Sequence, residues 1–122
     1  MPVKSSDSPV INWPGIDQVI AELEKWADAL VARRGDVVKL GYFGSYARGD
    51  WSVGSDLDLV IVLSNAQECF ERRAADFDTT DLPVPVDLLV YTMNEWENMK
   101  DDGSRFYEVM EKEGKWIVNR SE

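Results

Sequence analysis

The sequence has no histidine and only one cysteine, Cys69, among its 122 residues. The absence of histidine excludes Ser-His and Cys-His nucleophile pairs and the histidine-rich zinc sites. A lone cysteine cannot form an internal disulfide or a cysteine-rich metal site, so we expect a reducing compartment and a cytoplasmic protein. Carboxylates, hydroxyls, backbone amides and hard metal ions remain as the groups that can carry chemistry.

Positive charge is also scarce. Thirteen lysine and arginine residues stand against 23 aspartate and glutamate residues, which gives a net charge of −10. Without a basic face to grip phosphates, no direct binding of nucleic acid is expected. No apolar run approaches the roughly 18 residues of a membrane helix, and the N-terminus lacks the apolar stretch of a signal peptide, so we expect no membrane attachment.

The composition that remains is typical of one globular domain. Hydrophobic residues make up 44% of the chain and charged residues 30%, and a domain takes about 150 residues on average. Residues 1–12 are polar and contain two prolines, so we assign them to a loose lead-in. Residues 13–122 are expected to form a single domain.

Hydrophobic periodicity predicts an alternation of helices and strands. The expected elements are a helix at about 15–34, strands at 37–43 and 56–63, a helix at 65–78, a strand at 85–91, two short helices and a strand at 115–119. This order, α β β α β α α β, indicates an α+β fold of two layers, with a small mixed sheet packed against helices. The direction in which the first two strands pair remains open.

Short polar patterns mark the predicted helix ends. Ser64 with Gln67, and Thr92 with Glu95, each resemble a capping box at the start of a helix. Ser104 is expected to cap the last helix. Cys69, on the helix predicted after the second strand, is expected to be a small buried hydrophobic residue.

Three aspartates stand out because they interrupt apolar strands. Asp56 and Asp58 are two residues apart on one strand, so their side chains leave the same face, and Asp87 lies in a second apolar strand. Such carboxylates are unfavourable there and repel one another unless a cation joins them. Mg²⁺ or Mn²⁺ suits hard oxygen ligands, and a pair of such ions can support displacement at phosphorus. Taken alone, Asp87 is also compatible with a solvent-facing position on an edge strand.

A glycine and a serine follow directly after the strand at 37–43. Gly44 lets the backbone approach a ligand closely, and if Ser45 opens a helical turn, its hydroxyl and the first amides can receive an anion. Arg48 either adds positive charge for phosphate or pairs with Asp50. Trp51 in the same loop is a core residue or stacks on a base or a partner.

These residues together resemble a known signature. Gly44-Ser45, ten further residues, Asp56-Leu57-Asp58-Leu59 and then Val86-Asp87-Leu88 are similar to the motif of the DNA polymerase beta-type nucleotidyltransferase superfamily. More narrowly, GSYARGDWSVGSDLDLVIVL resembles the minimal nucleotidyltransferases (MNT), and SRFYEVMEKEGKWIV looks like the closing helix and strand of that group. The resemblance covers residues 15–118.

The resemblance implies a nucleotidyltransferase fold and a set of roles. The aspartates matching Asp56 and Asp58 bind two Mg²⁺ ions in that superfamily. The residue matching Asp87 helps to bind the catalytic metal and activates the acceptor hydroxyl. The residues matching Gly44 and Ser45 hold the triphosphate. The implied reaction transfers AMP from ATP to a hydroxyl and releases pyrophosphate.

The resemblance also implies a partner. Minimal nucleotidyltransferases act as antitoxins of HEPN-domain toxins, and some transfer AMP to a tyrosine of that partner, so a hetero-oligomer is expected. Two alternatives remain open: a non-catalytic antitoxin binding module of the same fold, and a small-molecule nucleotidyltransferase of the antibiotic-modifying type. The latter usually carries an extra helical domain for its acceptor.

Overall fold

The computed structural model describes residues 13–120, so the lead-in predicted for residues 1–12 lies outside the described residues. The elements are α1 (Ile16–Arg33), β1 (Val37–Phe43), α2 (Ser45–Arg48), β2 (Leu57–Leu63), α3 (Phe70–Arg73), the 3₁₀ turn η1 (Ala74–Asp76), β3 (Val86–Thr92), α4 (Met93–Asp101), α5 (Arg105–Glu113) and β4 (Lys115–Asn119). In this part of the chain, no helix is both long and apolar enough to cross a membrane.

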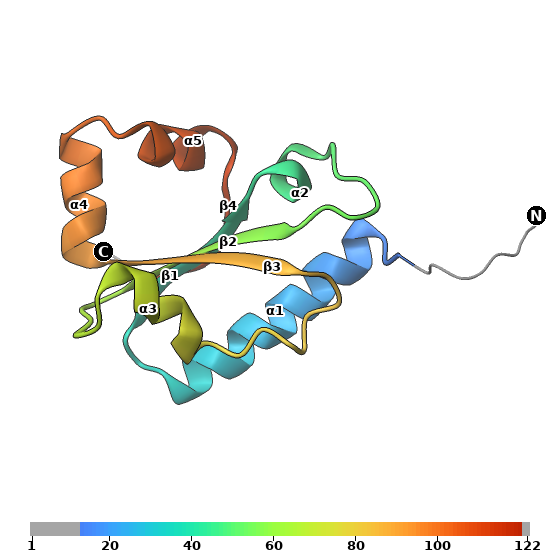
Figure 1. The fold of residues 1–122 in the computed structure, drawn as a ribbon, viewed down its shortest axis with the longest axis horizontal. Helices are drawn as coiled ribbons and strands as arrows, with labels where there is room; N and C mark the ends of the chain where they lie inside the picture. Colours follow the sequence, from blue (N-terminus) through green and yellow to red (C-terminus); the bar gives the residue numbers. More distant parts are fainter. Residues whose placement is uncertain (1–12, 121–122) are drawn as a thin grey trace, which may run out of the picture.

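The four strands form one sheet in the order β3-β2-β1-β4 (Figure 1). β1 pairs antiparallel with both β2 and β4, whereas β2 and β3 run parallel. This arrangement confirms the predicted mixed sheet packed with helices, and it settles the pairing of the first two strands as antiparallel. It also places β3, which carries Asp87, at an edge of the sheet.

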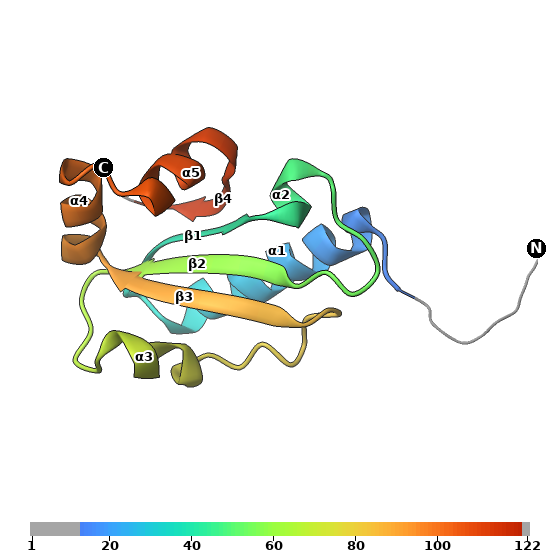
Figure 2. The same cartoon turned by 45° about the horizontal axis from the view of Figure 1, so that its top comes forward.

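Helices cover both faces of the sheet, with α1 on one face and α4 and α5 on the other (Figure 2). Alternate residues of β2 divide between the two faces. The first face carries Leu57, Leu59 and Ile61, which pack with the buried residues of α1. The second face carries Val60 and Val62, which pack with Trp96 of α4 and Met110 of α5. The apolar run of β2 is therefore explained by burial on both sides.

Two of the predicted helix caps are present. The amide of Glu95 donates to Thr92 Oγ1 at 3.1 Å, and the amide of Thr92 donates back to Glu95 Oε1 at 2.9 Å, which completes a capping box at α4. Ser104 Oγ accepts from the Tyr107 amide at the start of α5.

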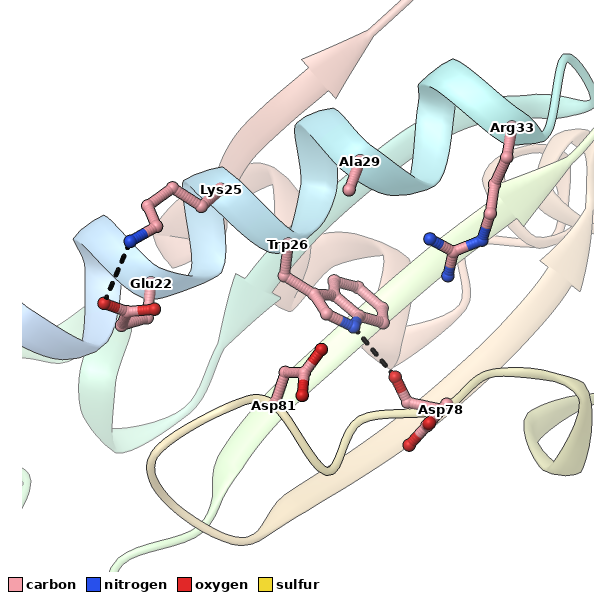
Figure 3. Close-up of a pocket in the computed structure, with 7 residues that line it drawn as sticks. All are labelled: Glu22, Lys25, Trp26, Ala29, Arg33, Asp78 and Asp81. Carbon is pink, nitrogen blue, oxygen red and sulfur yellow. Dashed lines mark hydrogen bonds and ion pairs between the residues drawn. The ribbon is translucent and has the colours of Figure 1, made fainter.

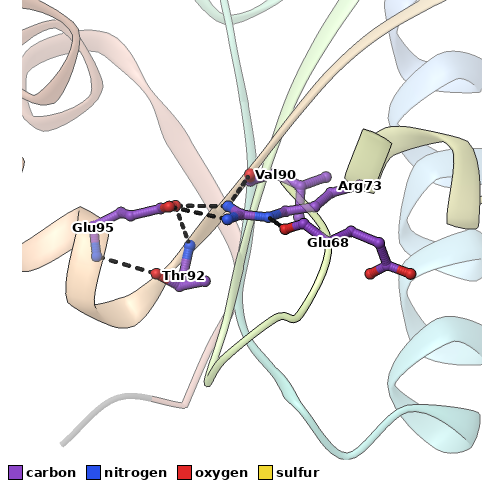
Figure 4. A network of polar contacts seen from close by, with 5 residues as sticks. All are labelled: Glu68, Arg73, Val90, Thr92 and Glu95. Carbon is purple, nitrogen blue, oxygen red and sulfur yellow. Dashed lines mark hydrogen bonds and ion pairs between the residues drawn. The ribbon is translucent and has the colours of Figure 1, made fainter. Parts of the chain in front are cut away.

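The helix predicted for 65–78 is wrong in extent. Only Phe70–Arg73 is α-helical, and a 3₁₀ turn follows; Cys69 stands at the N-cap, and no capping box forms at Ser64. The reason is Arg73, whose buried side chain donates to the Glu68 carbonyl at 2.9 Å, to the Val90 carbonyl at 3.2 Å and to both carboxylate oxygens of Glu95 (Figure 4). The Glu68 carbonyl is thereby taken by a side chain rather than by a helix amide.

The same loop overturns the expectation for Cys69, whose side chain is exposed rather than buried. Because the chain becomes helical only after this residue, Cys69 does not lie on the buried face of a helix. The Arg73 contacts instead anchor the segment to the outer edge of β3, where the Val90 carbonyl has no neighbouring strand to bind.

Candidate active site

The strand register brings two of the three predicted aspartates together. Asp58 is the direct partner of Asp87 in the parallel β2–β3 pair, and Phe43 is the direct partner of Asp58 in the antiparallel β1–β2 pair. Asp58 shares a strand face with Val60, so it projects on the side of the sheet that carries α4 and α5. Asp56 lies one residue before β2 begins.

Electrostatics show that the three carboxylates interact. The pKa of Asp58 is raised above its usual value, chiefly because the side chain is partly buried and then because of the negative charges of Asp87 and Asp56. Arg48 opposes this shift with its positive charge but does not cancel it. Asp56 and Asp87 themselves are exposed. The site therefore gathers negative charge that the neighbouring side chains leave unbalanced.

Position 44 requires a glycine for two reasons, namely its backbone conformation and the lack of space for a Cβ atom. Its φ of 75° and ψ of −149° are a conformation that side chains with a Cβ rarely adopt. A Cβ at this position would also overlap Asp58 Oδ2. The bare backbone thus lets the end of β1 lie directly against the Asp58 carboxylate.

Ser45 begins the short helix α2. This was the condition under which its hydroxyl and the first amides of the turn were predicted to receive an anion. The Gly44 carbonyl accepts from the amides of Ala47 and Arg48 at 3.1 and 2.9 Å, which closes the first turn. The amides at the very start of a helix have no carbonyl within their own turn. They lie on the same stretch of backbone that meets Asp58.

Arg48 is exposed and makes two ion pairs. Its Nε donates to Asp50 Oδ2 at 3.1 Å, and its Nη1 donates to Glu113 Oε1 of α5 at 3.4 Å. The pairing with Asp50 was one of the two roles predicted for Arg48. The guanidinium has five donors, so these two bonds leave others that can meet a ligand.

An open cleft of about 470 Å³ joins these features. Its lining residues are Phe43, Gly44, Ser45, Arg48, Ser55, Asp56, Asp58 and Val109. Five of the six predicted site residues line it, and the sixth, Asp87, adjoins it through its pairing with Asp58. The sequence analysis did not predict the other three lining residues, Phe43, Ser55 and Val109. Phe43 and Ser55 directly adjoin predicted site residues in the chain, whereas no sequence signal points to Val109.

A second hollow of about 580 Å³ lies between α1 and the loop after η1 (Figure 3). Its centre is Trp26, whose indole Nε1 donates to the Asp78 carbonyl at 2.9 Å. Because this hollow is on the α1 side, it lies across the sheet from the face on which Asp58 projects. None of the predicted site residues lines it.

Trp51 serves the loop between α2 and β2. Its ring stacks on Tyr46 with centroids 5.6 Å apart and planes 7° from parallel, and Tyr46 is fully buried. The hydroxyl of Tyr46 also accepts from the indole of Trp13 at 3.3 Å. One face of Trp51 is therefore covered by the core, which fixes the loop that leads to Asp56.

The donor set matches a hard divalent cation in kind. Within residues 13–120, no three acidic, histidine or cysteine side chains already converge on a point that could hold a metal ion. Mg²⁺ does not need such a cage, since it usually binds one or two carboxylates and completes its shell with phosphate oxygens and water. The pair of Asp56 and Asp58, with unbalanced charge on Asp58, fits that mode of binding.

Comparisons with known proteins identify the domain and its fold. The sequence profile of the nucleotidyltransferase domain family matches residues 23–119. The crystal structure of a proposed nucleotidyltransferase from Sulfolobus solfataricus is similar in fold, with a TM-score of 0.61 and 21% sequence identity over 86% of this chain and 84% of that chain. A comparison with curated proteins found no match.

The matched region contains every element from β1 to β4 and all three aspartates. The chain belongs to the nucleotidyltransferase domain family.

Proposed function

We propose that this protein is a Mg²⁺-dependent nucleotidyltransferase that transfers AMP from ATP to a tyrosine hydroxyl of a HEPN-type toxin and so neutralises it. Nucleotidyl transfer follows from the family. The choice of ATP, of a protein acceptor and of the antitoxin role is supported by the resemblance of the segment from Gly44 to Leu63 to the minimal nucleotidyltransferases. The cleft is open and Asp87 is exposed, so a hydroxyl on a macromolecule can approach.

The observation that carries the proposal is the pairing of Asp58 with Asp87 beside Gly44. Two carboxylates at paired positions of neighbouring strands repel each other and destabilise the sheet. Such a cost is expected where the pair serves a cation and the phosphates that the cation binds.

Each residue then has a role. Asp56 and Asp58 would hold Mg²⁺, and Gly44 with Ser45 would hold the triphosphate through backbone amides and the serine hydroxyl. A bound divalent cation supplies charge neutralisation and polarises phosphate oxygens. Asp87 accepts the proton of the acceptor hydroxyl, whose oxygen forms a bond to the α-phosphorus while the bond to the bridging oxygen of the β-phosphate breaks. Pyrophosphate is the leaving group.

A binding module without catalysis is the second candidate. The observation in its favour is the open cleft, whose surface a partner protein can cover without any chemistry. In that case the same surface would bind the toxin and neutralise it by occlusion alone.

The test uses ATP labelled at the α-phosphate, Mg²⁺ and, as candidate acceptor, the protein encoded by the gene next to that of this chain. Asp58→Asn removes the partly buried carboxylate, and Asp28→Asn, on the exposed side of α1, is the matched control. We expect label on this candidate acceptor with the wild type and with Asp28→Asn, and none with Asp58→Asn. A stable, neutralising complex that carries no label would refute catalysis and leave the binding module.

A further inference from the structure

Four aromatic side chains form a continuous row on the α4 and α5 side of the sheet. Phe70 contacts Tyr91 with ring centroids 5.0 Å apart, Tyr91 contacts Phe106 at 5.8 Å, and Phe106 contacts Phe43 at 4.9 Å. We call these four residues the aromatic row. They come from α3, β3, α5 and β1, so no single amphipathic element accounts for them.

The row is only half covered. Its inner side packs on buried Trp96, which lies 5.9 Å from the Tyr91 ring and 6.2 Å from the Phe106 ring. On the outer side Phe70 is 36% exposed, one of two large hydrophobic residues so exposed in the described part of the chain, and the other three rings are partly exposed. Aromatic residues are the side chains most often enriched at the centres of protein interfaces.

Two members of the aromatic row, Phe43 and Tyr91, connect it to the candidate active site. Phe43 lines the cleft and is the strand partner of Asp58. Tyr91 lies on the same strand and the same face as Asp87, four residues away, which is about 13 Å along the strand. A protein seated on the row would thus place its neighbouring side chains within reach of Asp87.

The charges around the row indicate the kind of partner. Arg73 is ion-paired with Glu95, and Arg48 with Asp50 and Glu113. On the chain segments around Phe70 and Phe106, the exposed acidic residues outnumber the exposed basic ones: Glu68, Glu71, Asp101, Asp102 and Glu108 against Arg72, Lys100 and Arg105. The cleft end carries the three aspartates, and the chain as a whole has a net charge of −10. An apolar centre with a negative surround complements an apolar surface that is flanked by lysine and arginine.

We propose that the aromatic row is the docking surface for the acceptor protein of the proposed function, and that this acceptor presents an apolar surface flanked by basic side chains. The inference rests on the proposed function for the identity of the acceptor. The location of the surface rests on the ring contacts and on its continuity with the cleft.

The test measures the affinity of this protein for the candidate acceptor, the protein encoded by the neighbouring gene. Phe70→Ser should weaken binding at least tenfold, because removing an exposed aromatic side chain that a partner buries commonly costs that much. The neighbouring exposed residue supplies the matched control, Cys69→Ser, which should bind as the wild type does. Phe70→Lys should bind more weakly than Phe70→Glu if the partner is basic. Affinity for ATP should not change in any of these variants.

The outcomes separate this inference from the proposed function. Weaker binding by Phe70→Ser, together with labelling that is restored at high acceptor concentration, supports both. Wild-type labelling with unchanged binding by Phe70→Ser overturns the docking surface alone. Loss of binding by Phe70→Ser without any labelling by the wild type retains the surface and refutes catalysis. The proposed occupant is refuted if the wild type forms no complex with the candidate acceptor. It is also refuted if sedimentation shows that the wild type associates with itself and that Phe70→Ser abolishes this self-association.

Discussion

Replacing Gly44 by alanine tests whether the close approach of β1 to Asp58 matters for the reaction. The backbone at Gly44 lies in a region reserved for glycine, which costs an alanine about 1–3 kcal/mol. The overlap with the Asp58 carboxylate adds crowding of about 1–3 kcal/mol unless the carboxylate moves. We expect Asp58 to move, and a displacement of about 1 Å reduces transfer roughly 100-fold.

Gly49→Ala is the matched control. Gly49 also has a positive φ, 86°, but an added Cβ meets nothing within 4 Å. This variant should lose about 1 kcal/mol of stability and keep its transfer rate. Urea unfolding gives the stabilities and α-phosphate labelling gives the rates. The reasoning fails if the two variants lose transfer equally, or if Gly44→Ala retains the wild-type rate.

Three further substitutions probe the charges. Burial and the neighbouring carboxylates raise the pKa of Asp58 in the folded state, so the stability of the fold falls as pH rises from about 4 through that higher pKa. Asp58→Asn should therefore raise the melting temperature in metal-free buffer at pH 7. A lower melting temperature would contradict this. Arg73 lowers the pKa of Glu95, so the stabilisation by the Glu95 carboxylate is present above pH 4.5 and is lost as pH falls through the lower pKa of the folded state. Glu95→Gln should cost about 1–2 kcal/mol of unfolding free energy at pH 7, measured by urea unfolding. The exposed Glu97→Gln is the control and should cause no change. Arg48→Gln should leave the melting temperature unchanged and weaken ATP binding in calorimetry, and equal ATP affinity would exclude Arg48 from the phosphate site.

The elements that the sequence predicts well are those whose signals are local. Helix α1 and strand β2 follow from apolar spacing, and the Thr92–Glu95 capping box forms as its pattern predicts. The helix predicted from Ser64 fails because a distant contact decides that segment, namely the buried side chain of Arg73 on the β3 edge and on Glu95. Spacing along the chain carries no signal for such a contact.

The predictions for the candidate site divide in the same way: local spacing predicts its residues, but not the contacts that depend on the whole fold. The spacing of Gly44, Asp56 and Asp58 predicts the candidate site from sequence, and the structure places all three along one cleft. The neighbour relation of Asp58 and Asp87 depends on the register of the parallel β2–β3 pair, which local spacing does not specify. Val109 enters the cleft only because α5 folds back over β1, which follows from packing of the whole domain.

The central claim is that the three aspartates and the Gly44–Ser45 turn form one site for a divalent cation and a nucleoside triphosphate. A crystal structure with Mn²⁺ and a non-hydrolysable ATP analogue tests it most directly, since Mn²⁺ is located by its anomalous scattering. We predict Mn²⁺ between Asp56 and Asp58, beside Asp87, with the triphosphate on the amides that follow Gly44. Nucleotide bound in the hollow around Trp26, or Mn²⁺ bound away from Asp58, would contradict the account.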